Sequence, residues 1–308
     1  MSRVLSHYAS ERGLIGIVRS QALFATNFLD LNDSSEFFYA LRIIVEESVQ
    51  KALQLIPEEI RGPLREDFDL EKSMEEYLQQ IRANIADSDG YDSLYVTSFA
   101  VGRSDDENQR GILTLWDRYT SFQGYCLQFD EADLRRKLRT EIETHSYSMI
   151  DLFDVKYGVD KSSDQFQNLV TRFSTILRLQ LCHHLNDYRA APDDAELVLE
   201  SVFLKELFHF CATHKDPAFS DEREVRILAF PHGRAQSRPF QGLQTSKTIH
   251  RRGNVENGAR YIVIGESVLP GIIPNKIVIG PKAEMDIWMQ EGLYPLKPAI
   301  TKSDLPVR

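Results

Sequence analysis

The chain has 308 residues, of which 42% are apolar and 27% charged, a balance typical of soluble globular proteins that argues against long disorder or a fibrous repeat. Its 36 Lys and Arg against 46 Asp and Glu give a net charge of −10, so a nucleic-acid site would require a local basic patch. Three widely spaced cysteines without a CxxC pair argue against a disulfide framework or a zinc knuckle. The sequence starts without a signal-peptide pattern and has no membrane-length apolar run, which predicts a cytoplasmic protein with no membrane contact.

Hydrophobic spacing and turn residues predict the elements of the first half of the chain. Strands are expected at 4–8 and 22–26, separated by a helix over 11–20 that Ser10 caps. Further along the chain we expect helices over 36–55 and 68–85, a turn at 87–92, a buried strand at 93–101, a charged loop at 102–109, a short helix over 112–119 and a strand at 124–129.

The second half continues with mixed elements: a helix over 132–144, a strand at 149–157, a helical stretch over 163–214 that breaks near Pro192, and strands at 224–230, 261–264 and 276–279. Strands and helices do not alternate as in a doubly wound sheet, which favours the α+β class. We therefore expect a single α+β domain over 1–308. Its core would be a split, mainly antiparallel sheet, and residues 37–92 and 160–214 would be helical insertions.

Several common catalytic signatures are absent from the sequence. It has no GxGxxG after a strand, no GxxxxGK[ST], no GxSxG, no HExxH and no EF-hand loop, which argues against the corresponding enzyme classes. The histidines at 183, 184, 209 and 214 lie in a helical stretch with no metal-ligand spacing, so no metal site is expected.

Two segments near the N-terminus could contact a ligand. The first, His7-Tyr8-Ala9-Ser10, places an imidazole just before a helix N-terminus, where free N–H groups and a partial positive charge suit a phosphate. The alternative is that His7 is an edge residue and Ser10 only a helix cap. The second segment runs from Ala25 to Asp33 and places Thr26 and Asn32 after a strand, but ordinary turn hydrogen bonds are the favoured explanation of its polar side chains.

A third segment lies in the middle of the chain and comprises 95–99, 115–119 and 124–129, which include Ser98, Trp116, Arg118 and Tyr119. Aromatic rings and an arginine between two strands could hold a flat ring and a phosphate. The alternative is that the aromatic residues belong to the core and that Arg118 pairs with Asp117 at the surface.

The fourth segment brings carboxylates to the start of a buried strand. Glu224 and Arg226 share one face of that strand, because side chains repeat every second residue. The alternative is an exposed edge of charged pairs. A carboxylate held here could stabilise positive charge on a ribose or position an acceptor, and Glu224 is favoured over Glu222 because it adjoins the apolar strand.

A basic loop over 232–252 carries five cations and no acid, namely Arg234, Arg238, Lys247, Arg251 and Arg252. Such a local positive charge in an acidic protein is typical of a nucleic-acid contact. A solvated, flexible loop explains the same residues equally well, because Gly233, Pro239 and Gly242 interrupt it.

The order of these segments resembles the bacterial domain-of-unknown-function family numbered 2971. The resemblance rests on the motifs His7-Tyr8-Ala9-Ser10, Gly13-Leu14-Ile15-Gly16-Ile17, 28–33 with Glu36, Ser98-Phe99, Trp116, Tyr119, Gly124-Tyr125-Cys126-Leu127-Gln128-Phe129, 222–226 and 277–282. The motif layout is in turn similar to that of ADP-ribosyltransferases that use NAD.

That resemblance implies an ADP-ribosyltransferase-like fold and an effector that uses NAD as its substrate, such as a toxin or antiphage defence component. It implies that Glu224 is the catalytic carboxylate, that His7 touches the nicotinamide ribose, and that Tyr119 or Trp116 stacks on nicotinamide. Tyr8, Ser10, Thr26, Asn32, Ser98 and Arg118 would complete the NAD site.

The implied partners are a nucleic-acid or protein acceptor and a neutralising or defence-system protein. Two further functions stay open at this point: a nucleic-acid-binding effector or nuclease that uses the basic loop, and a non-catalytic sensor or binding module.

Overall fold

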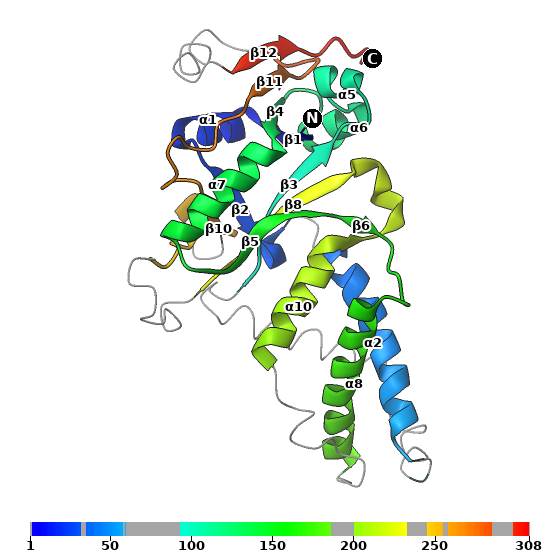
Figure 1. Ribbon diagram of the computed structural model, residues 1–308. Coiled ribbons are helices and arrows are strands. Elements are labelled where there is room, and N and C mark those ends of the chain that lie inside the picture. The colour runs from blue at the N-terminus through cyan, green and yellow to red at the C-terminus, as the bar shows by residue number, and fades with distance from the viewer. Residues whose placement is uncertain are drawn as a thin grey trace. The chain divides into compact units, whose positions relative to one another are not determined.

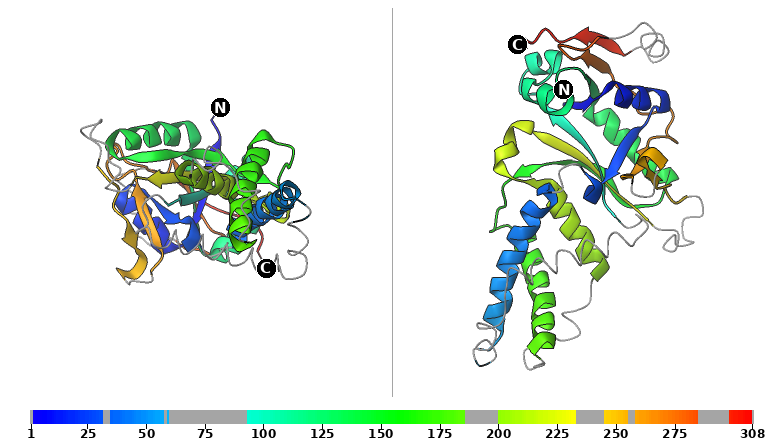
Figure 2. Two further views of the ribbon diagram at one scale, coloured as in Figure 1. Left: turned by 90° about the horizontal axis from the view of Figure 1, so that it is seen from below. Right: turned by 180° about the vertical axis from the view of Figure 1, so that it is seen from behind.

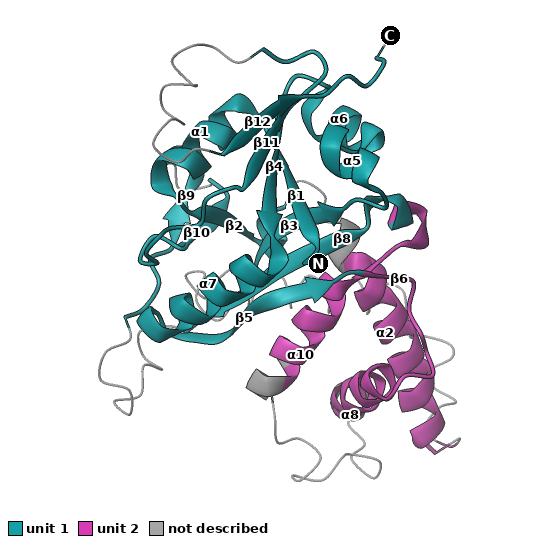
Figure 3. Cartoon of the chain, turned by 45° about the horizontal axis from the view of Figure 1, so that its top comes forward, with its two compact units in different colours: residues 1–31, 91–155, 220–308 teal, residues 32–90, 156–219 magenta. Residues whose placement is uncertain are grey.

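The computed structural model describes residues 2–31, 35–57, 59, 93–185, 200–232, 245–254, 258–284 and 298–307. The chain forms two compact units (Figure 3). Unit 1 comprises 1–31, 91–155 and 220–308, and unit 2 comprises 32–90 and 156–219. The expected single domain with helical insertions at 37–92 and 160–214 stays a prediction. The expected helix over 68–85 and the turn at 87–92 lie outside the described residues.

Unit 1 contains a large, mainly antiparallel sheet (Figure 1). Its described strands are β1 Val4–Ala9, β2 Leu23–Asn27, β3 Tyr95–Val101, β4 Tyr125–Asp130, β5 Tyr147–Asp154, β8 Glu224–Pro231, β9 His250–Arg251, β10 Arg260–Ile264, β11 Lys276–Ile279 and β12 Ala299–Lys302. The order is β12-β11-β4-β1-β3-β2-β10-β9, and β8 pairs with both β3 and β5. Only β11 and β12 pair in parallel among these strands. The predicted α+β class with a mainly antiparallel sheet is therefore confirmed.

The sheet divides along one edge of β3. Strand β2 pairs with β3 only at Tyr95 and Val96, and β1 pairs with it only at Ala100 and Val101. The other edge of β3 pairs with β8 from Tyr95 to Ala100. Residues 97–99 therefore have a strand neighbour on the β8 side, whereas β1 and β2 diverge on the opposite side. We call the place beside residues 97–99 where β1 and β2 diverge the split.

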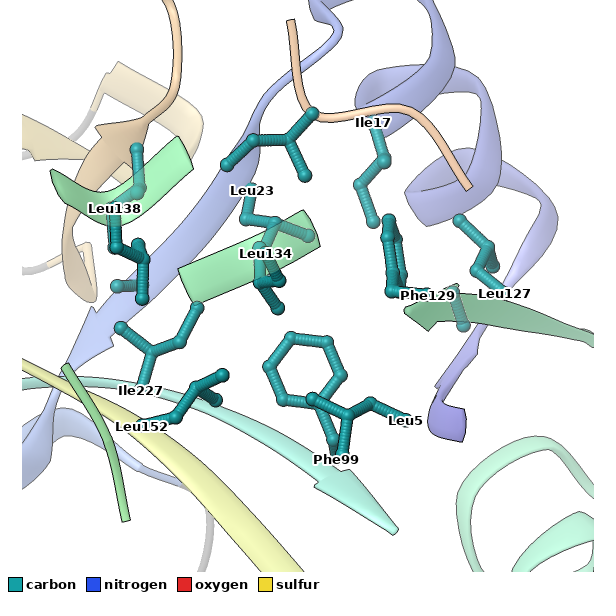
Figure 4. Packing of buried hydrophobic residues seen from close by; sticks show 14 of the residues in the cluster. Leu5, Ile17, Leu23, Phe99, Leu127, Phe129, Leu134, Leu138, Leu152 and Ile227 are labelled. Atoms are coloured by element: carbon teal, nitrogen blue, oxygen red, sulfur yellow. The ribbon is translucent and has the colours of Figure 1, made fainter. Parts of the chain in front are cut away.

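Helices cover the two faces of this sheet differently. Helices α1 Glu11–Ser20 and α7 Glu131–Thr144 pack on one face, over a core that includes Leu5, Phe99, Leu127 and Ile227 (Figure 4). Helix α6 Leu113–Thr120 packs beside β1 on the opposite face, where Trp116, Cys126 and Val278 form a smaller cluster. The two sides of the sheet thus carry a large apolar core and a smaller one.

Helix α5, Asp105–Arg110, occupies the segment predicted as a charged loop over 102–109, so that prediction is wrong. Ser104 caps the helix by accepting a hydrogen bond from the Glu107 N–H at 3.2 Å, and three acidic residues follow in the first turn. A serine followed three residues later by glutamate is the signature of a capping box. The run of charges concealed a helix whose stability comes from its N-terminal cap and dipole rather than from an apolar face.

Unit 2 is mainly helical, with α2 Ser35–Leu55, α8 Asp164–Leu185 and α10 Glu200–Thr213. Helices α2 and α8 lie side by side (Figure 2), and the hydroxyl of Ser48 donates to the Val170 carbonyl across their interface. The short strands β6 Lys156–Tyr157 and β7 His214–Lys215 pair in parallel. The strand expected at 149–157 is thus two elements, β5 and β6, and the helical stretch over 163–214 contains α8 and α10. Among the described helices, none has both the length and the apolar character needed to cross a membrane.

Candidate functional site

A pocket of about 120 Å³ lies on the α6 side of the sheet in unit 1, beside the split. Ten residues line it: Ser6, His7, Tyr8, Ser98, Phe99, Ala100, Leu115, Tyr119, Glu222 and Glu224. This set brings together His7, Tyr119 and Glu224, which the resemblance had assigned to catalysis from three distant parts of the chain. Tyr8 and Ser98, two of the residues assigned to NAD binding, line the same pocket.

The alternation of side chains along the strands explains most of this wall. Ser6 and Tyr8 project from one face of β1, while Leu5 and Ala9 belong to the core on the other face. In the β3–β8 register Ala100 lies opposite Glu224, so their side chains share the pocket face. Helix α6 contributes Leu115 and Tyr119, which lie four residues apart on one side of the helix.

His7 reaches the pocket through the split. Its Nδ1 lies 2.9 Å from the carbonyl oxygen of Ser98, which has no strand partner on that side. A carbonyl can only accept a hydrogen bond, so Nδ1 carries the proton and donates. Burial lowers the pKa of His7 below its ordinary value and outweighs the opposing effect of this hydrogen bond. A neutral His7 therefore offers the lone pair of Nε2 as an acceptor in the pocket wall.

Tyr8 and Trp116 form the structural support of the pocket rather than a ligand platform. The Tyr8 oxygen accepts a hydrogen bond from the Ile112 N–H at 2.6 Å, and the Tyr8 ring meets Trp116 edge-on, with ring centroids 5.0 Å apart. Trp116 is completely buried, and its Nε1 donates to the Arg110 carbonyl. Trp116 does not line the pocket, so of the two rings assigned to stack on nicotinamide only Tyr119, which is half-exposed, lies in its wall.

Both glutamates of the pocket are buried and each is paired with an arginine. Glu224 accepts two hydrogen bonds from Arg226, from Nε at 2.7 Å and Nη2 at 2.8 Å, and both residues are almost fully buried. Glu222 pairs with Arg118 of α6, whose side chain is 47% exposed. A bidentate guanidinium fixes the orientation of a carboxylate as well as balancing its charge. The pocket thus presents two oriented carboxylates beside aromatic rings.

The other residues assigned to NAD binding lie elsewhere. Ser10 caps α1 by accepting a hydrogen bond from the Gly13 N–H, as the alternative interpretation proposes. The hydroxyl of Thr26 accepts a hydrogen bond from Arg252 and does not line the pocket. Asn32 lies outside the described residues. Arg118 is not itself in the pocket wall but holds Glu222, which is.

The cations of the basic loop do not form one surface. The ammonium of Lys247 is fully buried and pairs with Glu141 at 2.7 Å and with Glu266 at 2.8 Å, so it is not available to a phosphate. Arg251 and Arg252 are exposed, whereas Arg234 and Arg238 lie outside the described residues. The predicted nucleic-acid contact therefore depends on Arg251 and Arg252 among the residues that the structure describes.

Glu222 lines the pocket together with Glu224, although the sequence favours Glu224. Glu222 precedes the strand, yet it lies at the end of a short 3-10 helix over Pro217–Glu222 and is buried. The spacing Glu-x-Glu was the available signal. Ser6, Phe99, Ala100 and Leu115 also went unassigned, and their positions one or two residues from Tyr8, Ser98 and Trp116 could have suggested them.

Comparison with known proteins finds a family model that matches part of the chain. Residues 115–227 match the family model described as a protein of unknown function (DUF2971), which agrees with the resemblance found in the motifs. The match covers less than half of the chain but includes α6 from Leu115 onward and the two glutamates of the pocket. No curated protein and no solved structure matches the chain.

Proposed function

We propose that this pocket binds the nicotinamide-ribose end of NAD. The protein would be a transferase or glycohydrolase that breaks the glycosidic bond between nicotinamide and ribose. The observation that carries the proposal is the meeting of His7, Tyr119, Glu222 and Glu224 in one pocket. A pocket of about 120 Å³ is smaller than the roughly 300–1,000 Å³ of common small-molecule sites. One flat ring and part of its sugar would fill it, and the rest of the dinucleotide would lie outside.

The chemistry of the wall suits a cationic ring. Nicotinamide in NAD carries a positive charge, which an electron-rich aromatic face and nearby carboxylates attract. Tyr119 would stack on the ring, and Nε2 of the neutral His7 would accept a hydrogen bond from a ribose hydroxyl. Arg118, half-exposed beside the pocket, is the cation that we assign to a phosphate of the same ligand.

In the reaction, the electron pair of the glycosidic bond leaves with the ring nitrogen, which loses its positive charge. Positive charge then develops on the ribose, and the fixed carboxylate of Glu224 stabilises it. The anomeric carbon forms its new bond to the oxygen of water or to an acceptor nucleophile, whose proton passes to a carboxylate or to solvent. Water gives ADP-ribose, and a nucleic-acid or protein acceptor gives an ADP-ribosylated product.

Glu224→Gln tests this proposal because it keeps the shape of the side chain but removes the charge. We expect the release of nicotinamide from NAD to fall by about 10²–10³-fold, the usual effect of losing one preorganised electrostatic group. The KM for NAD should change much less, since the charge acts mainly in the transition state. Chromatography of free nicotinamide measures turnover, and Arg136→Ala, which removes an exposed ion pair on α7, is the control.

Glu222→Gln should have the milder effect on turnover. An unchanged rate in Glu224→Gln, or a wild-type protein that consumes no NAD with any acceptor offered, would contradict the proposal. A non-catalytic binding module is then the better description. It is the second candidate because arginines already balance the charge of both carboxylates. Calorimetry that detects NAD binding by a protein without turnover would support a binding module.

A further inference from the structure

Four consecutive residues, from the end of the 3-10 helix to the first residue of β8, each form an ion pair with a different partner. Asp221 pairs with Arg103, Glu222 with Arg118, Arg223 with Glu107, and Glu224 with Arg226. Glu222 and Glu224 line the pocket, whereas Arg223 and Glu107 do not. The segment thus carries the two pocket carboxylates on either side of an arginine that is tied to α5.

The backbone at Arg223 has a φ of 46°, in the left-handed region that non-glycine residues rarely occupy. Such a conformation persists only where surrounding contacts hold it. Here the Arg223 carbonyl accepts a hydrogen bond from the Val101 N–H at 3.1 Å, at the end of β3. Its side chain supplies the second contact, with Nη1 2.6 Å and Nη2 3.3 Å from the two carboxylate oxygens of Glu107.

Glu107 is itself held firmly in the first turn of α5. Its N–H donates to Ser104, and its Oε2 also accepts a hydrogen bond from the Arg103 N–H at 2.5 Å. Burial by itself would raise the pKa of Glu107, but the hydrogen bonds from Arg223 and Arg103 lower it on balance, so the carboxylate stays charged. The partner that Arg223 meets is therefore an ionised, oriented group on a capped helix.

From these contacts we propose that Arg223 is a positioning residue, whose bidentate pair with Glu107 fixes the left-handed turn that directs Glu222 and Glu224 into one pocket. The effect on turnover rests on the proposed function. The adjacent pair of Arg103 with Asp221 serves as a natural contrast, because those side chains are 64% and 78% exposed and only one hydrogen bond joins them. Exposed pairs of that kind contribute little.

Arg223→Gly separates the side chain from the backbone, since glycine adopts a positive φ without strain. We expect kcat for nicotinamide release to fall by about 10–100-fold, the cost of a carboxylate misplaced by about 1 Å, with KM for NAD within about threefold of wild type. Glu107→Gln should behave similarly.

The exchanged pair Glu107→Arg with Arg223→Glu should recover most of the lost kcat, which a loss of folding would not allow. Arg103→Ala is the matched control and should keep wild-type kcat.

Hydrogen exchange supplies a readout that does not depend on turnover. In Glu107→Gln, which leaves the loop sequence intact, the amides of residues 222–226 should exchange at least about tenfold faster than in wild type or Arg103→Ala, because local opening governs such exchange. Faster exchange in a protein that consumes no NAD would retain the positioning role and reject only the proposed reaction. Unchanged exchange in Glu107→Gln, or full kcat in Arg223→Gly, overturns the inference.

Discussion

His7 is a titratable residue held in one form by its surroundings. Its imidazole lies in the split of the sheet, donates from Nδ1 to the Ser98 carbonyl and has its pKa lowered by burial. Protonation would add charge to a poorly hydrated site and would remove the acceptor that Nε2 offers in the neutral form. The same feature that shapes the pocket therefore makes it sensitive to acid.

The stability of the fold should depend on pH through His7. A folded-state pKa below the unfolded value of about 6.5 means that the contribution of His7 is fully present above about pH 6.5 and is lost as pH falls through the folded pKa. His7→Asn keeps an amide donor near the position of Nδ1 but does not titrate. Between pH 7 and 5, the free energy of unfolding of wild type should fall relative to that of His7→Asn, by at most about 1.4 kcal/mol per pH unit.

Urea unfolding at a series of pH values measures this difference. Comparing wild type with His7→Asn removes the contributions of His145, His209 and His214, whose pKa values burial also lowers. A constant difference between the two proteins from pH 7 to 5 would show that His7 titrates equally in the folded and unfolded chain.

At the scale of elements, a buried ionic cluster joins the last turn of α7 to two loops and β5. Glu141 is fully buried and accepts hydrogen bonds from Lys247 at 2.7 Å, from the hydroxyl of Tyr147 at 3.0 Å and from the Gly265 N–H at 3.0 Å. These three donors come from separate parts of unit 1. Satisfying one carboxylate in this way fixes the position of all of them.

Lys247→Ala should destabilise unit 1 strongly, because it leaves the Glu141 carboxylate buried without its cation. Breaking a buried pair in this way typically costs about 3–5 kcal/mol. The double variant Lys247→Met with Glu141→Gln should be milder, since it removes both charges and keeps a side-chain oxygen that can accept from Tyr147 or Gly265. Denaturant unfolding measures the loss. Arg136→Ala, which breaks the exposed pair with Asp133, should cost at most about 1 kcal/mol, and an equally small loss in Lys247→Ala would contradict the assigned role.

The sequence could predict the elements that have a clear pattern of apolar residues. Strands β3, β4 and β8 are nearly continuous runs of buried residues, and helices α1 and α7 have buried residues at helical spacing. Helix α5 and strand β12 lack that signal, because none of the α5 residues is buried and all four residues of β12 are exposed. Tertiary contacts and caps, rather than local hydrophobicity, determine these two elements.

The pocket itself could be predicted only in part. Strand alternation gives the face that Glu224 and Arg226 share, but not the registers that bring His7 and Tyr119 to the same place. Lys247 is a residue that the sequence wrongly predicts to be exposed, because it lies in a basic stretch. Its buried partner Glu141 is 106 residues away in the sequence. Long-range pairing of this kind leaves no trace in one sequence.

For the whole molecule, a net charge of −10 opposes any polyanion that approaches it. Arg251 and Arg252 lie exposed on β9 and in the turn after it. If a nucleic acid is the acceptor in the proposed reaction, these two arginines are the described part of the basic loop that can meet its phosphates.

Arg251→Glu with Arg252→Glu should therefore weaken oligonucleotide binding and flatten its salt dependence. Losing two phosphate contacts changes the slope of log K against log salt by about 1.8 for a duplex. Arg12→Glu with Arg19→Glu on the exposed side of α1 alters the net charge equally and should have the smaller effect. Equal effects of the two double variants, measured by fluorescence anisotropy, would leave the loop with only a general electrostatic role.

The order of the two units along the chain affects how the protein folds during its synthesis. The last residue of unit 2 is residue 219. The sheet of unit 1 still needs β10 to pair with β2 and β12 to pair with β11, and β12 ends at Lys302. At roughly 5–20 residues per second, a ribosome needs on the order of 4–17 s for the intervening 83 residues (302 − 219). At the start of that interval β2 and β4 have emerged, while their partners β10 and β11 have not. Unpaired strand edges are prone to association, so the nascent chain is prone to aggregation until these partner strands emerge.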